Sequence, residues 1–220
     1  MNKFNNYAVT DLPSPKRIEA LVDGVFALSM VLLASGLALP EVLRPSGRMD
    51  LVQTLSQMWP KFLLYGLSFL VLGVYWTLHQ KQFRIIIGYD GVLLWINIIF
   101  LMFVALVPFS TYLLSNQYKE WLSIVFYGTN QIVVCQWLFL HWCYASHRHR
   151  LIRPDTSPHQ CRIPMILFQS ISLGFLTAIV VASFSPIIAL ILFGLTVIIT
   201  MGLLTSRHRD LYADQWEIGE

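Results

Sequence analysis

The sequence predicts an all-α membrane protein with six transmembrane helices. Hydrophobic residues make up 56% of the 220 positions and charged residues only 12%, about half the charged share of an ordinary soluble domain. The mean hydropathy is correspondingly high, at +0.61. The remaining charges are gathered between apolar stretches of roughly 20 residues, the length that a helix needs to cross the hydrocarbon core of a bilayer.

Six stretches meet this length requirement. They run from Ile18 to Leu39, Trp59 to His79, Gly91 to Leu114, Trp121 to Ala145, Ile163 to Phe184 and Ile187 to Thr205. Only the short "SFSP" segment separates the last two stretches, which are therefore predicted to form an antiparallel helical hairpin. Tryptophans near the ends of the stretches are expected to anchor them at the membrane interfaces: Trp59, Trp76, Trp121, Trp137 and Trp142.

The distribution of Lys and Arg predicts how the chain is oriented in the membrane. With the N-terminus inside, eleven of these residues lie on the cytoplasmic side and four on the other. We therefore expect a cytoplasmic N-terminal segment (1–17), a six-helix transmembrane domain (18–206) and a cytoplasmic C-terminal tail (207–220). The basic loop 147–162 is interpreted first as part of this positive-inside signal; binding of an anionic lipid or a regulator is the alternative.

The sequence shows none of the patterns that mark an enzyme or a stable metal site. The three cysteines (Cys135, Cys143 and Cys161) have neither paired spacing nor neighbouring ligands. HExxH, GxSxG and phosphate-binding glycine motifs are absent. We expect no catalytic residue, no bound metal, no cofactor and no nucleic-acid partner, and membrane lipid as the surroundings.

The first predicted helix carries an apolar stripe. At roughly 100° per residue, one narrow face, flanked by Gly24 and Val31, collects Leu21, Leu28, Leu32, Ser35 and Leu39. The other faces carry small residues that allow close helix packing: Ala27, Ala34, Gly36 and Ala38. Periodicity alone favours a lipid-facing or core face over the lining of a pore.

Asp23 lies inside this first helix, where a carboxylate is expensive. An ionisable residue within a membrane span usually faces protein or water and has a partner. Arg17 lies on a different face of the same helix, so a partner from another helix is expected. His79 and Arg84, at the end of the second span, are predicted to lie at the same cytoplasmic level.

Two segments resemble the transmembrane protein 175 family of lysosomal and prokaryotic potassium channels. "RIEALVDGVFALSMVLLASGLALP" matches that family's R-x-x-x-F-S-D motif at Arg17 and Asp23, with Leu21 and Val22 replacing the Phe and Ser. "YWTLHQKQFRIIIGYDGVLLWINIIFLMFVALVPFSTYLL" is similar to its second and third helices, at Trp76, His79, Phe83, Asp90, Leu94, Asn97, Pro108 and Phe109. The similarity covers about residues 16 to 115; the last three helices agree in number and length.

The resemblance implies a homotetrameric cation channel with the first helices around a central pore. That family has no carbonyl filter loop and narrows its pore with a bulky apolar side chain five residues after the Asp, which here is Leu28. Val31 and Ser35 fall on the other pore positions, and Leu32 shares their stripe. A ring of four leucines would form a hydrophobic gate that closes by dewetting.

Val31 departs from the family pattern. Many relatives carry a Thr at this position, whose hydroxyl ring can replace part of the water around an ion, whereas a ring of Val cannot. Two interpretations remain open: selectivity for potassium is weak, or Ser35, one turn further along, supplies the polar ring.

A set of polar residues near the cytoplasmic ends of the first three helices forms a predicted structural or gating network: Arg17, Asp23, Trp76, His79, Asp90 and Asn97. Such residues fix the register of neighbouring helices. Protonation of His79 offers a possible gating role, because histidine titrates near neutral pH. Asn97 is expected to form a hydrogen bond with a neighbouring helix.

Three functions are compatible with these features. The first is a homotetrameric, potassium-permeable channel in the plasma membrane of a prokaryote, with potassium as the permeant ion. The second is a secondary carrier with a midplane polar site around Asn97, Asn130 and Gln131. The third is a non-conducting membrane scaffold. The argument for it is that Val31 removes the polar ring expected in the lining of the pore. A channel built from four first helices requires a tetramer, so the oligomeric state separates it from the other two.

Overall fold

A computed structural model describes residues 13–37 and 51–216. Within these residues the chain is helical, and no strand longer than an isolated bridge occurs. The elements are α1 (Lys16–Ser35), α2 (Leu51–Gln57), α3 (Trp59–Phe83), α4 (Gly91–Ala105), α5 (Val107–Asn116), α6 (Trp121–Ser146), the 3-10 helix η3 (His147–His149), α7 (Pro158–Ala182) and α8 (Pro186–Trp216). Six segments of the described chain are long and apolar enough to span a membrane, which confirms the predicted fold class.

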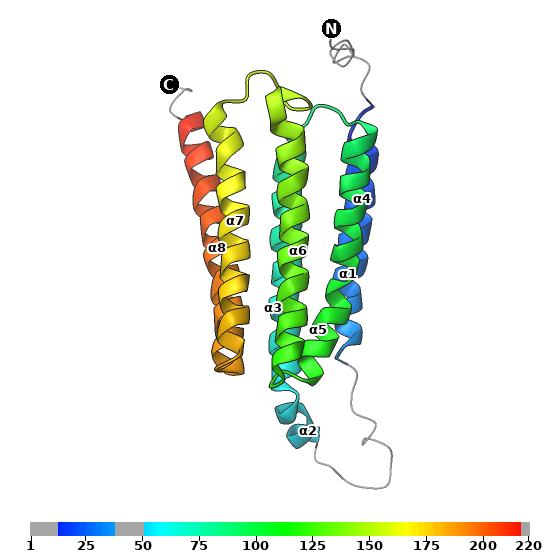
Figure 1. Ribbon diagram of the computed structural model, residues 1–220, viewed down its shortest axis with the longest axis vertical. Helices are drawn as coiled ribbons and strands as arrows, with labels where there is room; N and C mark the ends of the chain where they lie inside the picture. The colour runs from blue at the N-terminus through cyan, green and yellow to red at the C-terminus, as the bar shows by residue number, and fades with distance from the viewer. Residues whose placement is uncertain (1–12, 38–50, 217–220) are drawn as a thin grey trace.

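The helices form an elongated bundle in which α6 is central (Figure 1). It packs against α4 and α5 on one side and α7 on the other. The α7–α8 pair forms the predicted hairpin, with the turn at Ser183–Ser185. The beginnings of α1, α4 and α7 and the ends of α3 and α6 lie at one end of the bundle (Figure 1), which is the arrangement that the Lys and Arg distribution requires.

The third span is broken, although the sequence analysis treats it as one continuous helix. α4 ends at Ala105 and α5 begins at Val107, with Pro108 in the first turn of α5. Proline has no backbone N–H and its ring clashes with the carbonyl four residues earlier, here that of Val104, so a continuous helix is interrupted at this point. The same rule could have been applied to the sequence.

Two other boundaries also differ from those expected. α7 begins at Pro158, earlier than the predicted Ile163, because Ser157 and Gln160 form a reciprocal capping box and proline suits the first helical turn. Part of the basic loop is therefore helical. The short helix α2, before the second span, was not predicted. Leu39, the expected end of the first span, lies outside the described residues, within which α1 ends at Ser35.

Gly174 permits close contact between α7 and α8. A Cβ atom at this position would lie 2.6 Å from Oγ1 and 2.7 Å from Cγ2 of Thr196. Thr196 is β-branched, and its hydroxyl donates to the Leu192 carbonyl at 2.8 Å, so it has little freedom to move. We expect Gly174→Ala to lower the free energy of unfolding in detergent micelles by about 1–3 kcal/mol through overpacking.

Gly194→Ala is the matched control for this prediction, because a Cβ atom there would have no neighbour within 4 Å. It should leave stability unchanged or raise it slightly through helix propensity. Combining Gly174→Ala with Thr196→Ala should restore part of the loss. Equal effects of the two glycine substitutions would contradict the proposed close contact.

Candidate ion pathway and its supporting contacts

α1 has one buried face and one exposed face within the subunit. Ile18, Val22, Phe26 and Leu33 are almost fully buried, and α1 packs against α3, α4 and α5. The stripe predicted from the sequence forms the exposed face: Leu28 is 60% exposed and Val31 69%, and Leu32 and Ser35 are also exposed. A helix of this kind is attached along one side and presents an apolar surface on the other.

Two of the small residues of α1 lie outside its packing face within the subunit, and Ala38 lies outside the described residues. Ala27 and Ala34 are exposed. The bulky residues take this role instead, and the Phe26 ring lies 6.0 Å from the ring of Phe100 in α4. The helical wheel identifies a stripe, but it cannot tell which of two apolar faces meets the rest of the bundle.

Asp23 has a partner on another helix, as expected. Its carboxylate Oδ1 accepts a hydrogen bond from Nε1 of Trp76 in α3 at 2.8 Å, and hydrogen bonds to an ionised acceptor are stronger than neutral ones. The residue predicted as an interfacial anchor is therefore a link between α1 and α3. His79 and Arg84 line the same pocket as Asp23, which has a volume of about 220 Å³.

Arg17 is exposed on the first turn of α1. No hydrogen bond or ion pair joins its side chain to another residue of the described chain. Its membership of the polar network stays a prediction.

His79 and Asn97 connect α3 with α4. Nε2–H of His79 donates to the amide oxygen of Asn97 at 2.9 Å, which confirms the expected interhelical bond of Asn97. The imidazole lies 4.5 Å from the Phe83 ring and 5.6 Å from the Phe100 ring, stacked against both. Both polar residues are buried, so the pair is part of the core and does not line the exposed face of α1.

A second histidine extends this cluster, and the sequence analysis gave it no role. Nδ1–H of His141 in α6 donates to the side-chain oxygen of Gln82 at 2.8 Å, and Gln82 donates to the Leu138 carbonyl at 3.1 Å. The His141 ring lies 5.5 Å from that of His79. The signal that could have identified it is the presence of an ionisable side chain within a membrane-spanning helix.

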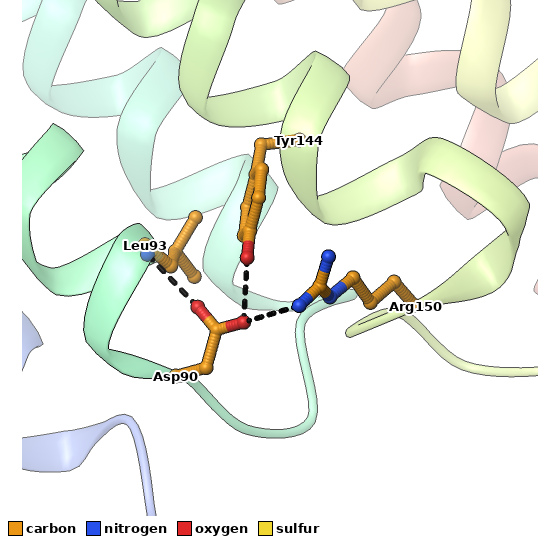
Figure 2. A network of polar contacts seen from close by, with 4 residues as sticks. All are labelled: Asp90, Leu93, Tyr144 and Arg150. Carbon is orange, nitrogen blue, oxygen red and sulfur yellow. Dashed lines mark hydrogen bonds and ion pairs between the residues drawn. The ribbon is translucent and has the colours of Figure 1, made fainter. Parts of the chain in front are cut away.

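Asp90 is the centre of a polar contact network at the start of α4 (Figure 2). Its Oδ1 accepts from the backbone N–H of Leu93 at 2.9 Å and thereby caps α4. Its Oδ2 accepts from the Tyr144 hydroxyl at 2.6 Å and lies 3.2 Å from Nη2 of Arg150. The sequence analysis included Asp90 but neither Tyr144 nor Arg150.

Backbone hydrogen bonds join the same two loops beside Asp90. The N–H of Ile87 donates to the Leu151 carbonyl at 2.9 Å, and the N–H of Arg153 donates to the Ile85 carbonyl at 3.1 Å. The α3–α4 connection and the basic loop are thus held together by backbone and side-chain contacts. Of the predicted network, the described chain makes three separate pairings: Asp23 with Trp76, His79 with Asn97, and Asp90 with residues of α6 and the basic loop.

Trp142 does not anchor the chain at a membrane interface. It is fully buried, and its Nε1 donates to the Cys161 carbonyl at 2.8 Å. It therefore links α6 to α7. A tryptophan near the end of a span can face lipid or protein, and composition alone does not distinguish the two.

Two of the three polar residues proposed for a carrier site have side-chain partners. Asn97 is bonded to His79, and Asn130 donates to Ser110 of α5 at 3.2 Å. The side-chain amide of Gln131 is buried and makes no hydrogen bond within the described residues; only its backbone carbonyl is bonded, accepting from the Tyr75 hydroxyl at 3.0 Å. Within the described residues, no group of three or more His, Cys, Asp and Glu side chains could hold a metal ion.

These features define a six-span helical membrane protein whose first helix keeps an apolar face free. A family model described as "Endosomal/lysosomal potassium channel TMEM175" matches residues 17–108. A potassium channel of Streptomyces collinus is 29% identical over 183 residues, 81% of this chain and 87% of that protein. A potassium channel of Chamaesiphon minutus is 36% identical over 102 residues, 46% of this chain and 49% of that protein.

The fold agrees with a solved structure. The crystal structure of a lysosomal potassium-selective channel TMEM175 homolog from Chamaesiphon minutus matches with a TM-score of 0.74. The match covers 84% of this chain and 95% of the other at 23% identity, so the likeness concerns the fold. Residues 17–108 thus match the model of the TMEM175 family, and the relatives named above are described as potassium channels.

Proposed function

We propose that the chain is one subunit of a homotetrameric, potassium-permeable cation channel, with α1 of each subunit lining a central pore. The observation that carries this proposal is the free apolar face of α1, with Leu28, Val31, Leu32 and Ser35 exposed on a helix whose other side is buried. The potassium channels named among its relatives support potassium as the permeant species.

Leu28 is the proposed constriction. Four leucines meeting at an axis exclude water, and a hydrophobic constriction blocks ions by dewetting. The hydrogen bond of Asp23, which lies five residues before Leu28, supports this arrangement because it fixes the rotation of α1 relative to α3. The set Arg17, Asp23, Trp76, His79, Asp90 and Asn97 then serves to hold the pore helix and its neighbours in register.

The four Ser35 side chains of the proposed tetramer would form the polar ring that Val31 cannot supply. The Ser35 hydroxyl donates to the Leu32 carbonyl at 2.6 Å. Because the proton is directed into the helix, the lone pairs of Oγ remain available as acceptors. An exposed oxygen in this state can coordinate a cation, whereas the Val31 side chain has no polar atom.

We assign the channel to the plasma membrane of a prokaryote, with both termini cytoplasmic and the regions 1–17, 18–206 and 207–220 as predicted. The bacterial sources of the relatives support the membrane. The orientation rests on the basic residues of the described chain, which are concentrated at one end of the bundle: Lys16, Arg17, Lys81, Arg84, Arg148, Arg150, Arg153 and Arg162. Lys61 and Lys119 mark the other end.

Potassium flux through purified protein in potassium-loaded liposomes tests the proposed function. We expect Leu28→Ala to raise the flux roughly tenfold or more, since each 1.36 kcal/mol removed from a barrier gives about tenfold in rate. Ile198→Ala is the matched control, because Ile198 is an apolar side chain of α8 with a similar exposed fraction, 64%. It should leave the flux unchanged.

Other outcomes would favour the alternative functions. Slow, saturable flux that Leu28→Ala leaves unchanged would indicate a carrier. The absence of flux through correctly folded tetramers of both the wild type and Leu28→Ala would indicate a scaffold. A monomer or dimer in mild detergent would contradict a pore made of four α1 helices.

A further inference from the structure

A groove at the cytoplasmic end of the bundle runs between α3, α6, α7 and α8. Its volume is about 440 Å³, and its lining is mostly apolar, with Leu78 from α3, Trp142 from α6, Ile166 from α7 and Leu203 from α8, and with Ile85 from the α3–α4 connection. Ile166 and Leu203 are more than half exposed, so the groove opens to the outside of the subunit. No residue of α1 is among those that line it.

Basic residues surround the cytoplasmic end of this groove. Lys81 lines it directly. The backbone N–H of Arg153 donates to the carbonyl of Ile85, a lining residue, at 3.1 Å. Arg162 precedes the lining residue Ile163 in α7. Both arginines are exposed. Between residues 147 and 162 the sequence has a single carboxylate, Asp155.

We propose that this groove binds an anionic phospholipid of the cytoplasmic leaflet, with an acyl chain against the apolar walls and the headgroup phosphate beside Arg153 and Arg162. The walls lie within the ends of membrane-spanning helices, where the surrounding solvent is lipid. The basic end lies at the level of the headgroups, and basic residues at the cytoplasmic surface attract anionic lipids. Charge complementarity selects an anionic headgroup over a zwitterionic one.

This site is separate from the proposed pore, so its existence does not depend on ion conduction. It also gives the basic loop a second role beyond orienting the chain in the membrane. Two features place the loop at the groove: the backbone bond between Arg153 and Ile85, and the bond of Trp142 to the Cys161 carbonyl.

Native mass spectrometry of the full chain in neutral detergent tests this proposal, with dioleoyl phosphatidylglycerol and dioleoyl phosphatidylcholine as competing probes. We expect preferential retention of phosphatidylglycerol. Each basic residue near an anionic surface contributes a factor of about five, so Arg162→Gln and Arg153→Gln should each reduce the preference about fivefold.

Arg148→Gln is the matched control, because Arg148 is an exposed arginine of the same loop that is neither bonded to a lining residue nor next to one in the sequence. It should leave the preference unchanged. Ser170→Phe provides an independent variant: Ser170 is exposed on α7 and lines the groove, so a bulky ring there should displace both lipids while leaving the fold intact.

Three results would overturn the proposal. The first is equal retention of the two lipids. The second is an equal effect of Arg148→Gln and Arg162→Gln, which would show general attraction to the loop. The third is a change of oligomeric state with Ser170→Phe while lipid retention stays the same, which would identify a second copy of the chain as the occupant. Flux measurements enter none of these comparisons, so failure here and failure of the channel proposal are distinguishable.

Discussion

His79→Ala should lower the free energy of unfolding by about 4 kcal/mol, the largest single effect we expect. The substitution removes a ring stacked against Phe83 and Phe100, and truncation of a buried aromatic ring to alanine typically costs about 3–5 kcal/mol. It also leaves the buried amide oxygen of Asn97 without its donor. The midpoint of unfolding on titration of mixed micelles with a denaturing detergent measures the loss.

His79→Phe separates packing from hydrogen bonding. It keeps an aromatic ring between Phe83 and Phe100 and removes only the donor to Asn97. The expected cost is about 1 kcal/mol, because interhelical hydrogen bonds in membrane proteins average roughly 0.6 kcal/mol and reach about 1.7. The double substitution His79→Phe with Asn97→Leu should recover most of this loss. A larger effect of His79→Phe than of His79→Ala would contradict the packing argument.

Asp90→Ala should lower the free energy of unfolding by about 3 kcal/mol. The lost helix cap accounts for about 1 kcal/mol, and the charge-assisted bond from Tyr144 for about 1.5–3. The ion pair with Arg150 adds little, because the two side chains are 25% and 50% exposed and exposed pairs contribute about 0–1 kcal/mol. The same detergent titration measures the effect.

Two variants sharpen this second prediction. Asp90→Asn keeps a good capping residue but removes the charge, so it should cost less than Asp90→Ala. Asp155→Asn is the matched control, because Asp155 is an exposed carboxylate of the facing loop whose side chain makes no hydrogen bond or ion pair within the described chain. It should have almost no effect. A loss from Asp155→Asn equal to that from Asp90→Asn would show that general loop charge, not the Asp90 contacts, is responsible.

Features that depend on local sequence were predictable. The six spans follow from apolar length, and the exposed stripe of α1 from helical periodicity. The break before Pro108 and the early start of α7 at the Ser157–Gln160 capping box were missed, although both have a local signal.

Pairings between distant helices were not predictable. Asp23 and Trp76 are 53 residues apart, Asp90 and Tyr144 54, and Gln82 and His141 59. Which side chains meet depends on the rotation and depth of two helices at once, and no spacing within one helix encodes this. The family resemblance brought Asp23, Trp76, His79, Asp90 and Asn97 into one set, but it did not supply Tyr144, Arg150, Gln82 or His141.

The central place of α6 has a consequence for how the protein is made. Gln82 and Asp90 find their partners His141 and Tyr144 in α6, which leaves the ribosome later. Synthesis proceeds at about 5–20 residues per second, so the 54 residues from Asp90 to Tyr144 take roughly 3–11 seconds. During this interval the first three spans carry polar groups that lack their final partners. A nascent chain stalled before α6 would therefore keep polar groups without their final partners, which are costly within a bilayer.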